Sequence, residues 1–396
     1  MKIALLHYTT WPQFGGVENV IRDQALMLTR HGHEVLVMSG IGENPEEGYA
    51  FELIPELSPE FPLYQAIKRV LDNGQSDQNF SKYRAVLVEA LSPYLAQVEV
   101  TFVHNVFTMH HNLPLTQALH DLSSRFRFVA WTHDLVAANS DYSVPNPTKQ
   151  PWALMRQSAP NVRYVTASEQ RREELTSRLQ PPVEASVIPN GLDLGRLFYL
   201  TVEMRESLEA LALSSRDFVF LLPARIMLRK NVEFAIDLMR ELKAKGRNPL
   251  LLITGSSDVY SPAAAQYGQF LRQTVHDQLH QNVVFVSDHF IVTDEILHDL
   301  YSLADCLLFP SKQEGFGLPI LEAAYFRLPL WCNSVPAFWA TEGEGAFMIN
   351  ALAQLGDAVT WLEAHPSYRL RRRVRQQFDL DVLYERHYEP LLKSYA

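Results

Sequence analysis

A short stretch around residue 316 combines glycines at close spacing with a predicted helix start. Gly315 and Gly317 flank Phe316, and two glycines two apart let a backbone adopt positive φ and approach a ligand closely. The apolar run 306–309 before them predicts a buried parallel strand, and Pro319 lies in the first turn of the amphipathic helix expected after them. Loop amides and the positive end of a helix then face one point, which favours a phosphate or another anion.

Two carboxylates bracket this predicted anion site. Glu314 precedes the glycines on the loop, and Glu322 lies about one turn into the helix. Because carboxylates repel phosphate, we expect them to accept hydrogen bonds from neutral hydroxyls. A diphosphate flanked by two hydroxyl-rich groups is a nucleotide sugar. The alternative is an ordinary strand-to-helix turn in a doubly wound sheet.

The string E-G-F-G-L-P-I-L-E, from Glu314 to Glu322, resembles the E-x7-E motif of retaining GT-B glycosyltransferases, in particular those of glycosyltransferase family 4. The resemblance implies that Glu314 contacts hydroxyls of the donor sugar and takes part in catalysis. It implies that Glu322 contacts the ribose. The loop residues that it implies for donor binding are Gly315, Phe316, Gly317 and Leu318.

Two cations lie in a loop after the apolar run 218–223, which predicts another buried strand. Arg225 as a planar fork and Lys230 as a point charge could neutralise a diphosphate, although a lone cation is more often a solvated surface charge. The pair is similar to an Arg and Lys of the family that hold the diphosphate and stabilise its departure. Replacing either with Ala should then lower turnover about 10²-fold with little loss of stability. The resemblance also brings the nucleotide against Gly255.

The first half of the chain begins with a strand, a glycine loop and a helical pattern, which together predict a βαβ unit. A nicotinamide enzyme would carry G-x-G-x-x-G in this first turn, and this sequence does not. Gly15 and Gly16 resemble the Gly-Gly loop that the family places near the acceptor and the transferred sugar. A tight turn is the alternative interpretation.

His133 and Asp134 follow a further predicted strand, 126–131. Ligands bind at the carboxyl ends of parallel strands in open α/β sheets. The resemblance makes His133 a catalytic contact of the donor sugar and puts Asp134 beside it in the cleft. A histidine that caps a loop or helix is the alternative.

Two other polar clusters have a structural explanation and a functional one. His104, His110 and His111 lie near a strand end, but a metal site would need ligands that converge from one rigid geometry, so we expect polar loop residues or acceptor contacts. Five arginines between residues 369 and 375 predict a solvated helix face. A patch for an anionic acceptor or a membrane surface is the alternative.

Composition limits the class of protein. A chain of 396 residues predicts two or three domains, and its net charge of −10 argues against a general nucleic-acid binder. The only two cysteines, Cys306 and Cys332, fit neither a disulfide framework nor a metal pair. The start of the chain lacks a signal-peptide pattern, and no run reaches the ~18 apolar residues of a membrane helix. We therefore expect a cytoplasmic protein without integral membrane association.

These observations and the resemblance together imply an α/β protein of the GT-B type, with two Rossmann-like doubly wound domains that face each other across a cleft. Residues 1–195 would bind the acceptor, residues 196–377 would bind the nucleotide sugar, and residues 378–396 would pack back on the first domain. The implied reaction transfers a hexose, with retention, from a donor of the UDP-glucose or GDP-mannose type to a small soluble or saccharide hydroxyl acceptor. No cofactor and no essential metal are expected, because no D-x-D pair is placed to hold one.

Three alternatives compete with glycosyl transfer. A GT-B-fold nucleotide-sugar epimerase would share the donor site. A sugar phosphorylase of the pyridoxal type would need a Schiff-base lysine, and nothing in the sequence marks one. A non-catalytic nucleotide- or glycan-binding module would not require the full set of Glu314, Glu322, Arg225 and Lys230.

Overall fold

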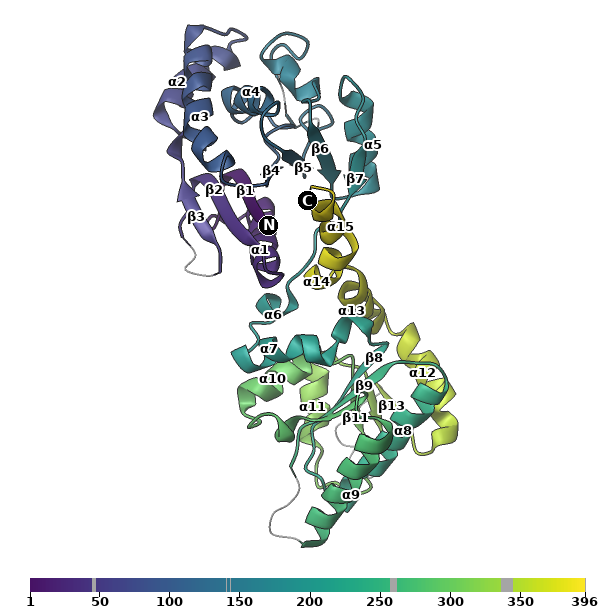
Figure 1. Cartoon of the computed structure of the whole chain (residues 1–396). Helices are drawn as coiled ribbons and strands as arrows, with labels where there is room; N and C mark the ends of the chain where they lie inside the picture. The colour runs from purple at the N-terminus through teal and green to yellow at the C-terminus, as the bar shows by residue number, and fades with distance from the viewer. Residues whose placement is uncertain (45–47, 140, 143, 257–261, 336–344, 396) are drawn as a thin grey trace. The chain divides into compact units, whose positions relative to one another are not determined.

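The structure is a computed structural model that describes residues 1–396 except 45–47, 140, 143, 257–261, 336–344 and 396. Its contacts divide the chain into two compact units (Figure 1). Unit 1 comprises Met1–Leu192 and Leu380–Ala396, and unit 2 comprises Asp193–Asp379. Each unit is one parallel sheet with helices on both faces, so the expected α/β class with two Rossmann-like domains is confirmed.

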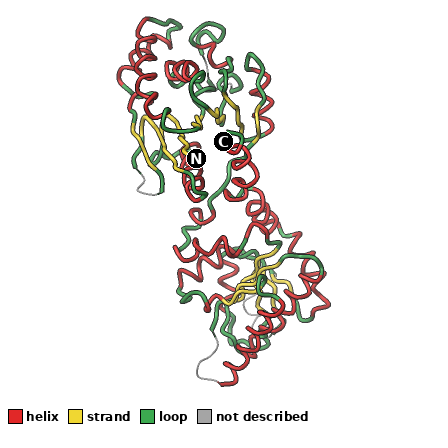
Figure 2. The backbone as a smooth tube through the Cα atoms, in the orientation of Figure 1, coloured by secondary structure: helices red, strands yellow, loops and turns green. Residues whose placement is uncertain are grey.

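Unit 1 is built on a seven-stranded parallel sheet with the order β3-β2-β1-β4-β5-β6-β7. Figure 2 shows the strands of the chain in yellow among the helices in red. The strands are β1 (Lys2–Thr9), β2 (Glu34–Ile41), β3 (Ala50–Leu53), β4 (Val100–His104), β5 (Phe128–Thr132), β6 (Val162–Thr166) and β7 (Ala185–Val187). The α-helices before residue 193 are α1 (Gly16–Arg30), α2 (Pro62–Asp72), α3 (Gln78–Leu95), α4 (Leu113–Leu122) and α5 (Glu169–Arg178). Short helical turns occupy η1 (Pro55–Leu57) and η2 (Trp152–Arg156).

The central strands of unit 1 are apolar on both sides because helices cover both faces of the sheet. β4 and β5 are buried at every position. One core contains Leu6 and Val103, and a second core on the other face contains Leu5 and Phe102. Ser168 caps α5 as expected, since its Oγ accepts a hydrogen bond from the amide of Arg171 at 3.2 Å.

The C-terminal segment packs on unit 1. It consists of α14 (Leu380–Leu383), the π-helical turn η8 (Tyr384–Tyr388) and α15 (Glu389–Lys393). Tyr388 stacks on Trp131 of β5 with 5.2 Å between ring centroids, and its hydroxyl accepts a hydrogen bond from Gln24 of α1 at 2.9 Å. The expected return of the final helix to the first domain is therefore confirmed.

Unit 2 is built on a six-stranded parallel sheet with the order β10-β9-β8-β11-β12-β13. The strands are β8 (Phe218–Leu222), β9 (Pro249–Ile253), β10 (Val283–Phe285), β11 (Cys306–Phe309), β12 (Leu330–Cys332) and β13 (Ala346–Met348). The α-helices are α6 (Leu194–Leu197), α7 (Val202–Leu211), α8 (Val232–Ala244), α9 (Pro262–Gln278), α10 (Asp294–Leu303), α11 (Leu318–Tyr325), α12 (Leu355–Ala364) and α13 (Pro366–Gln377). The short helical turns are η3 (Leu213–Ser215), η4 (Leu228–Lys230), η5 (Val286–Asp288) and η7 (Leu352–Gln354).

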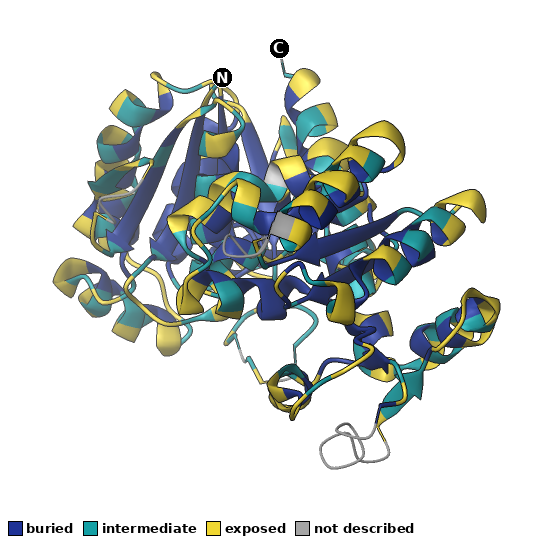
Figure 3. Ribbon diagram, turned by 90° about the horizontal axis from the view of Figure 1, so that it is seen from below, coloured by how far each residue is buried: buried dark blue, intermediate teal, exposed yellow. Residues whose placement is uncertain are grey.

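Buried strands also form the centre of unit 2. Figure 3 shows this pattern for the chain, with buried strands in dark blue and helices that are exposed on one side. Cys306 and Cys332 are buried on neighbouring strands, and neither forms a disulfide with a described residue. None of the helices in the described ranges is long and apolar enough to span a bilayer.

Two features of unit 2 differ from the sequence-based expectation. The sequence of residues 256–266 is loop-like and predicts a loop; residues 257–261 lie outside the described ranges, but helix α9 already begins at Pro262. The short apolar stretch 331–333 predicts a last strand, whereas strand β13 lies beyond the corresponding β12 as a sixth strand. Both segments lack a long apolar run, so their packing partners decide their structure.

The arginine run on α13 is a structural element of unit 2. The guanidinium of Arg375 is buried and pairs with Asp305 at 2.7 Å, and Arg372 pairs with Asp217 at 2.5 Å. Arg371 donates a hydrogen bond to a backbone carbonyl. The expectation of a solvated face is therefore wrong for these three arginines, because their charges tie the helix to the sheet.

Candidate functional site

The candidate site of unit 2 lies where its strand order reverses. From β8 the chain continues to β9 on one side, whereas β11 lies on the other side of β8 and continues to β12. The loops after β8 and β11 therefore diverge, which opens the crevice where open α/β sheets bind ligands. These two loops, residues 223–231 and 310–317, carry Arg225, Lys230 and Glu314.

The structure joins Lys230 to Glu314. The Lys230 Nζ lies 2.5 Å from Oε1 of Glu314, and the two side chains are only 12% and 8% exposed. Arg229 approaches Oε2 of the same carboxylate at 3.5 Å. An ammonium carries three N–H donors, so Lys230 keeps donors for a second partner while it binds Glu314.

Asn231 ties the two loops together. Its backbone is left-handed, with φ 56°, and its side-chain amide donates a hydrogen bond to the carbonyl of Pro310 at 3.1 Å. A second hydrogen bond runs from the amide of Lys312 to the carbonyl of Arg229 at 2.8 Å. The loop backbones are thus held in a fixed arrangement, which positions the charged side chains on them.

Arg225 is exposed and makes no ion pair or hydrogen bond with the residues that the structure describes. Its backbone packs on Gly255, where a Cβ would lie 2.4 Å from Cα of Arg225 and 2.2 Å from the carbonyl oxygen of Ala224. Only glycine fits at this position. The carbonyl of Gly255 accepts a hydrogen bond from Ser287 at 3.2 Å, so the loops after β8, β9 and β10 are connected.

The glycine loop leads into α11 as expected, but its two glycines differ. Gly317 caps the helix in a left-handed conformation with φ 93°, whereas Gly315 does not adopt positive φ, which corrects the expectation for that residue. Phe316 and Leu318 are 53% and 61% exposed. In the first turn of α11, Pro319 has no N–H and the amide of Ile320 donates to the carbonyl of Gly317 at 2.9 Å. The amides of Gly317 and Leu318 make no hydrogen bond with the described residues and are therefore available to an anion.

Glu322 lies one turn into α11 and is held by a neighbouring helix. Its Oε2 accepts a hydrogen bond from the hydroxyl of Tyr301 on α10 at 2.5 Å. Burial raises the pKa of Tyr301 strongly, and the Glu322 carboxylate adds to the shift, so the hydroxyl stays a donor. Tyr301 also stacks on Phe326 with 4.9 Å between centroids. The hydrogen bond from Tyr301 fixes the orientation of the Glu322 carboxylate, which we expect to bind the ribose.

The glycine loop of unit 1 contains a carboxylate that sequence reasoning missed. Glu18, in the first turn of α1, accepts a hydrogen bond from Thr9 Oγ1 at 2.5 Å. A Cβ on Gly15 would lie 2.0 Å from Oε2 of Glu18, so the carboxylate occupies the space under the loop. Gly16 is exposed and begins the helix. An acidic residue in the first turn was the available signal, because it complements the helix dipole.

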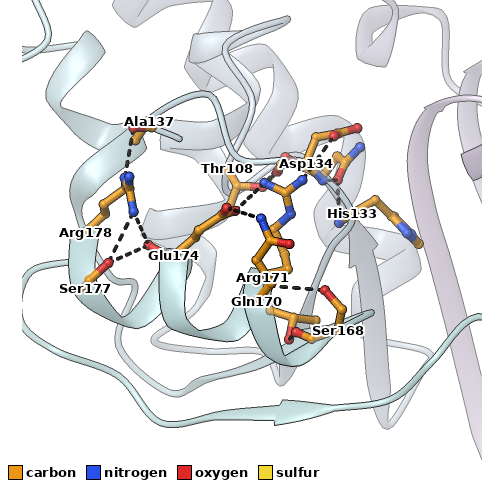
Figure 4. Close-up of polar contacts among 12 residues, drawn as sticks. Thr108, His133, Asp134, Ala137, Ser168, Gln170, Arg171, Glu174, Ser177 and Arg178 are labelled. Atoms are coloured by element: carbon orange, nitrogen blue, oxygen red, sulfur yellow. Dashed lines mark hydrogen bonds and ion pairs between the residues drawn. The ribbon is translucent and has the colours of Figure 1, made fainter. Parts of the chain in front are cut away.

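The side chains of His133 and Asp134 contact different partners. Figure 4 shows their side chains pointing in different directions from the end of β5. Both backbone amides donate to Oδ1 of Asn105, at 2.9 and 3.0 Å, and the Asp134 carboxylate lies 3.9 Å from Arg171 of α5. The His133 ring contacts His104 instead, with 3.0 Å between Nε2 and Nδ1.

The histidines at this edge of the sheet are neutral. Burial lowers the pKa of His133 to about 3 and that of His110 to about 4. Burial also lowers the pKa of His104 well below 6.5, and the nearby His133 adds to the shift. Within the described ranges, no group of three or more histidines, cysteines or acidic residues is arranged to hold a metal ion.

A cavity of about 550 Å³ follows the Asp134 loop in unit 1. Its wall combines apolar residues such as Val136, Trp152 and Met155 with polar ones such as Asn139 and Arg156. Tyr142 connects this wall to the neighbouring histidines, since its ring lies 6.0 Å from that of His111. The cavity can accommodate a small polar molecule with one charged group.

Two family models match the chain, one on each unit. Residues 14–196 match the model described as Glycosyltransferase Family 4, and residues 203–376 match the model described as Glycosyl transferases group 1. The boundary between the two matches falls close to the boundary between the two units, and together the matches span most of the chain.

Two curated relatives cover most of the chain. The mannosylglucosylglycerate synthase of Petrotoga mobilis is 22% identical over 364 residues, which cover 85% of this chain and 83% of that protein. The enzyme of the same name from Thermotoga maritima is 25% identical over 393 residues, with 91% and 89% covered. Among solved structures, the sucrose-phosphate synthase of Thermosynechococcus elongatus aligns over 99% of both chains with 18% identity and a TM-score of 0.39.

Proposed function

The chain belongs to the group 1, family 4 glycosyltransferases with the GT-B fold, and from this premise we propose that it transfers a hexose from a nucleoside diphosphate sugar to a hydroxyl acceptor with retention of anomeric configuration. The observation that carries the donor assignment is the joining of Lys230 and Glu314 at 2.5 Å, directly before the N-terminus of α11. A cation, a carboxylate and free helix amides at one point match a diphosphate attached to a sugar.

Each donor-side residue has a role in this proposal. Arg225 and Lys230 neutralise the diphosphate, and the amides of Gly317 and Leu318 stabilise the charge that develops as it leaves. Glu314 accepts hydrogen bonds from sugar hydroxyls once a substrate is present. Glu322 accepts them from the ribose, in the orientation that its hydrogen bond with Tyr301 gives it.

The remaining assignments concern unit 1. We assign His133 to the donor sugar and the Gly15–Gly16 loop to the region of sugar and acceptor. The acceptor is a small soluble or saccharide molecule, for which the cavity beside the Asp134 loop offers one cation. Mannose is the first candidate for the transferred sugar, because the names of both relatives that cover most of the chain specify a mannosyl product.

The proposed mechanism needs no protein base and no essential metal. In the proposed transfer the acceptor attacks from the side of the leaving group, and the departing diphosphate accepts the acceptor proton. The protein then has to orient the substrates and stabilise the anion, which cations and helix amides can do. Activity in the presence of a chelator tests the metal independence separately.

Incubation with a panel of nucleotide sugars and acceptors tests the proposal. The panel contains GDP-mannose and UDP-glucose as donors, and glucosylglycerate with other small saccharides as acceptors. Release of the nucleoside diphosphate together with an α-linked product, established by NMR, supports retaining transfer. An isomerised nucleotide sugar would instead indicate an epimerase, and binding without release would indicate a non-catalytic module.

A further inference from the structure

His104 and His133 form a stacked pair at the ends of two neighbouring strands. Their ring centroids are 5.3 Å apart and their planes differ by 12°. Nδ1 of His104 lies 3.0 Å from Nε2 of His133. His104 is completely buried, whereas His133 is partly exposed. One of these nitrogens must carry a hydrogen and donate a hydrogen bond to the lone pair of the other, because each neutral imidazole has one N–H donor and one acceptor nitrogen.

The second nitrogen of His104 decides which of the two donates. Nε2 of His104 is buried and has no hydrogen-bond partner among the described residues. A buried N–H group without an acceptor costs more free energy than a buried lone pair without a donor, and buried N–H groups without a partner are correspondingly rare. His104 is therefore protonated on Nδ1 and donates to His133. His133 must then carry its own proton on Nδ1.

Burial keeps both rings neutral by lowering the pKa of each, and neighbouring histidines add to the effect. His7, at the end of β1, interacts electrostatically with both rings, and it is itself buried and near Glu18 and His111. Burial is the largest cause of the lowered pKa of each ring in the pair. A protonated ring has an N–H on both of its nitrogens, so a protonated His133 could no longer accept the hydrogen bond from His104. Because the pKa values of both rings are lowered, this occurs only at acid pH.

We propose that His104 is a positioning residue that holds His133 in the tautomer with Nδ1–H, so that His133 offers an N–H donor, and not a lone pair, to a hydroxyl oxygen of the donor sugar. This inference rests on the proposed function, which assigns His133 to the donor sugar. His104 does not touch the substrate. It acts only by fixing the proton and the ring plane of its neighbour.

Histidine-nitrogen NMR spectra of isotopically labelled protein test the pair without any turnover. The signals of His133 are identified by their loss in His133→Gln. We expect Nδ1–H for His133 in the unaltered protein and in His104→Asn, whose side-chain amide can replace the Nδ1–H donor. In His104→Leu we expect a mixture of tautomers. A wild-type His133 protonated on Nε2, or an unchanged Nδ1–H in His104→Leu, would overturn the proposal.

Kinetics with the active donor give the second test. His104→Leu should lower kcat/KM about 10-fold, which is common when a residue that orients a substrate contact is lost. His104→Asn should keep most of the wild-type kcat/KM. In a His133→Ala background, His104→Leu should have no further effect, because the residue acts only through His133. His120→Leu is the control, since the Nε2 of the half-buried His120 is also buried and has no partner among the described residues. An equal loss in the His133→Ala background would show a merely structural role.

The two tests separate the two proposals. If no donor gives turnover, the proposed function fails while the NMR spectra still decide the state of the pair. Thermal unfolding of each variant identifies loss of fold. His104→Asn keeps the test valid if His104→Leu does not fold.

Discussion

Lys230 and Glu314, 84 positions apart in the sequence, form an ion pair with 2.5 Å between Nζ and Oε1, and both side chains are largely buried. In this arrangement the carboxylate is neutralised by a cation that we also assign to the diphosphate. The pair therefore couples the stability of unit 2 to the donor site. Replacing one partner leaves the other charge in a poorly solvated place.

Lys230→Ala should lower the free energy of unfolding by about 2 kcal/mol, because it removes a charge-assisted hydrogen bond to a carboxylate. Arg229, at 3.5 Å from Glu314, limits the loss.

The double variant Lys230→Met/Glu314→Gln should recover most of the stability, since it leaves no uncompensated charge. Both variants should lose at least ~10²-fold in turnover. Denaturant titration and diphosphate release separate the two effects, and a double variant as unstable as the single one would contradict the ion-pair argument.

Arg225→Ala should lower turnover and leave the stability of the protein almost unchanged. The side chain is exposed, so its loss should change the free energy of unfolding by less than about 0.5 kcal/mol. Turnover should fall about 10²-fold, because the cation acts on the leaving diphosphate. Arg240→Ala, which removes a surface arginine of α8, is the control for general charge effects. Wild-type turnover in Arg225→Ala would remove Arg225 from the phosphate site.

Tyr301→Phe tests the orientation of Glu322. It removes the hydroxyl that donates to Oε2 and keeps the ring that stacks on Phe326. We expect KM for the donor to rise about 10-fold with a small change in kcat, since the ribose contact is present in ground and transition states alike. Tyr368→Phe is the matched control, because its hydroxyl donates to the Asp217 carbonyl at 2.9 Å. An equal rise in KM in both variants would point to a general structural effect.

The fold could be predicted from the sequence where apolar runs were long and bounded. β11 has the predicted bounds, 306–309, because a buried strand follows a continuous apolar run. Helix α9 and strand β13 were missed, because neither has such a signal. The loops that carry the candidate site were proposed from their glycines and charged residues together with the family resemblance.

The contacts within the site could not be predicted. Sequence reasoning expects little loss of stability for Lys230→Ala, since nothing in the chain indicates a partner 84 positions away. The same holds for Tyr301, whose hydroxyl meets Glu322 only because α10 and α11 pack together. His104 was expected to be a polar loop residue, and its partner lies on the neighbouring strand. Such pairs depend on register and packing, which a single sequence does not specify.

Stability should fall as the solution becomes acidic below pH 6.5. Burial lowers the pKa of His120 to about 4 and that of His133 to about 3 in the folded protein, against an ordinary value of 6.5. Between these lowered pKa values and pH 6.5, the unfolded chain binds more protons than the folded chain. The free energy of unfolding therefore rises with pH in this window, and the contribution of these histidines is complete above pH 6.5. Each such histidine contributes at most about 1.4 kcal/mol per pH unit.

Urea titrations at several pH values between 4 and 7, a range that spans most of this window, measure the slope. His120→Phe should make it shallower, because it removes one group that must take up a proton on unfolding. His276→Gln removes an exposed histidine and is the control. An unchanged slope in His120→Phe would show that His120 is not held neutral in the folded protein.

The two glycines of the donor loop should respond differently to the same substitution. Gly317 has φ 93° at the N-terminus of α11, so Gly317→Ala should lower the free energy of unfolding by about 1–2 kcal/mol. A Cβ on Gly315 meets no atom within 4 Å, and its backbone is not left-handed, so Gly315→Ala should leave stability unchanged. Because a Cβ there would face an incoming ligand, we expect a weaker donor affinity all the same. Calorimetry with the nucleoside diphosphate measures this affinity, and equal affinities for Gly315→Ala and the unaltered protein would show that the diphosphate does not approach Gly315.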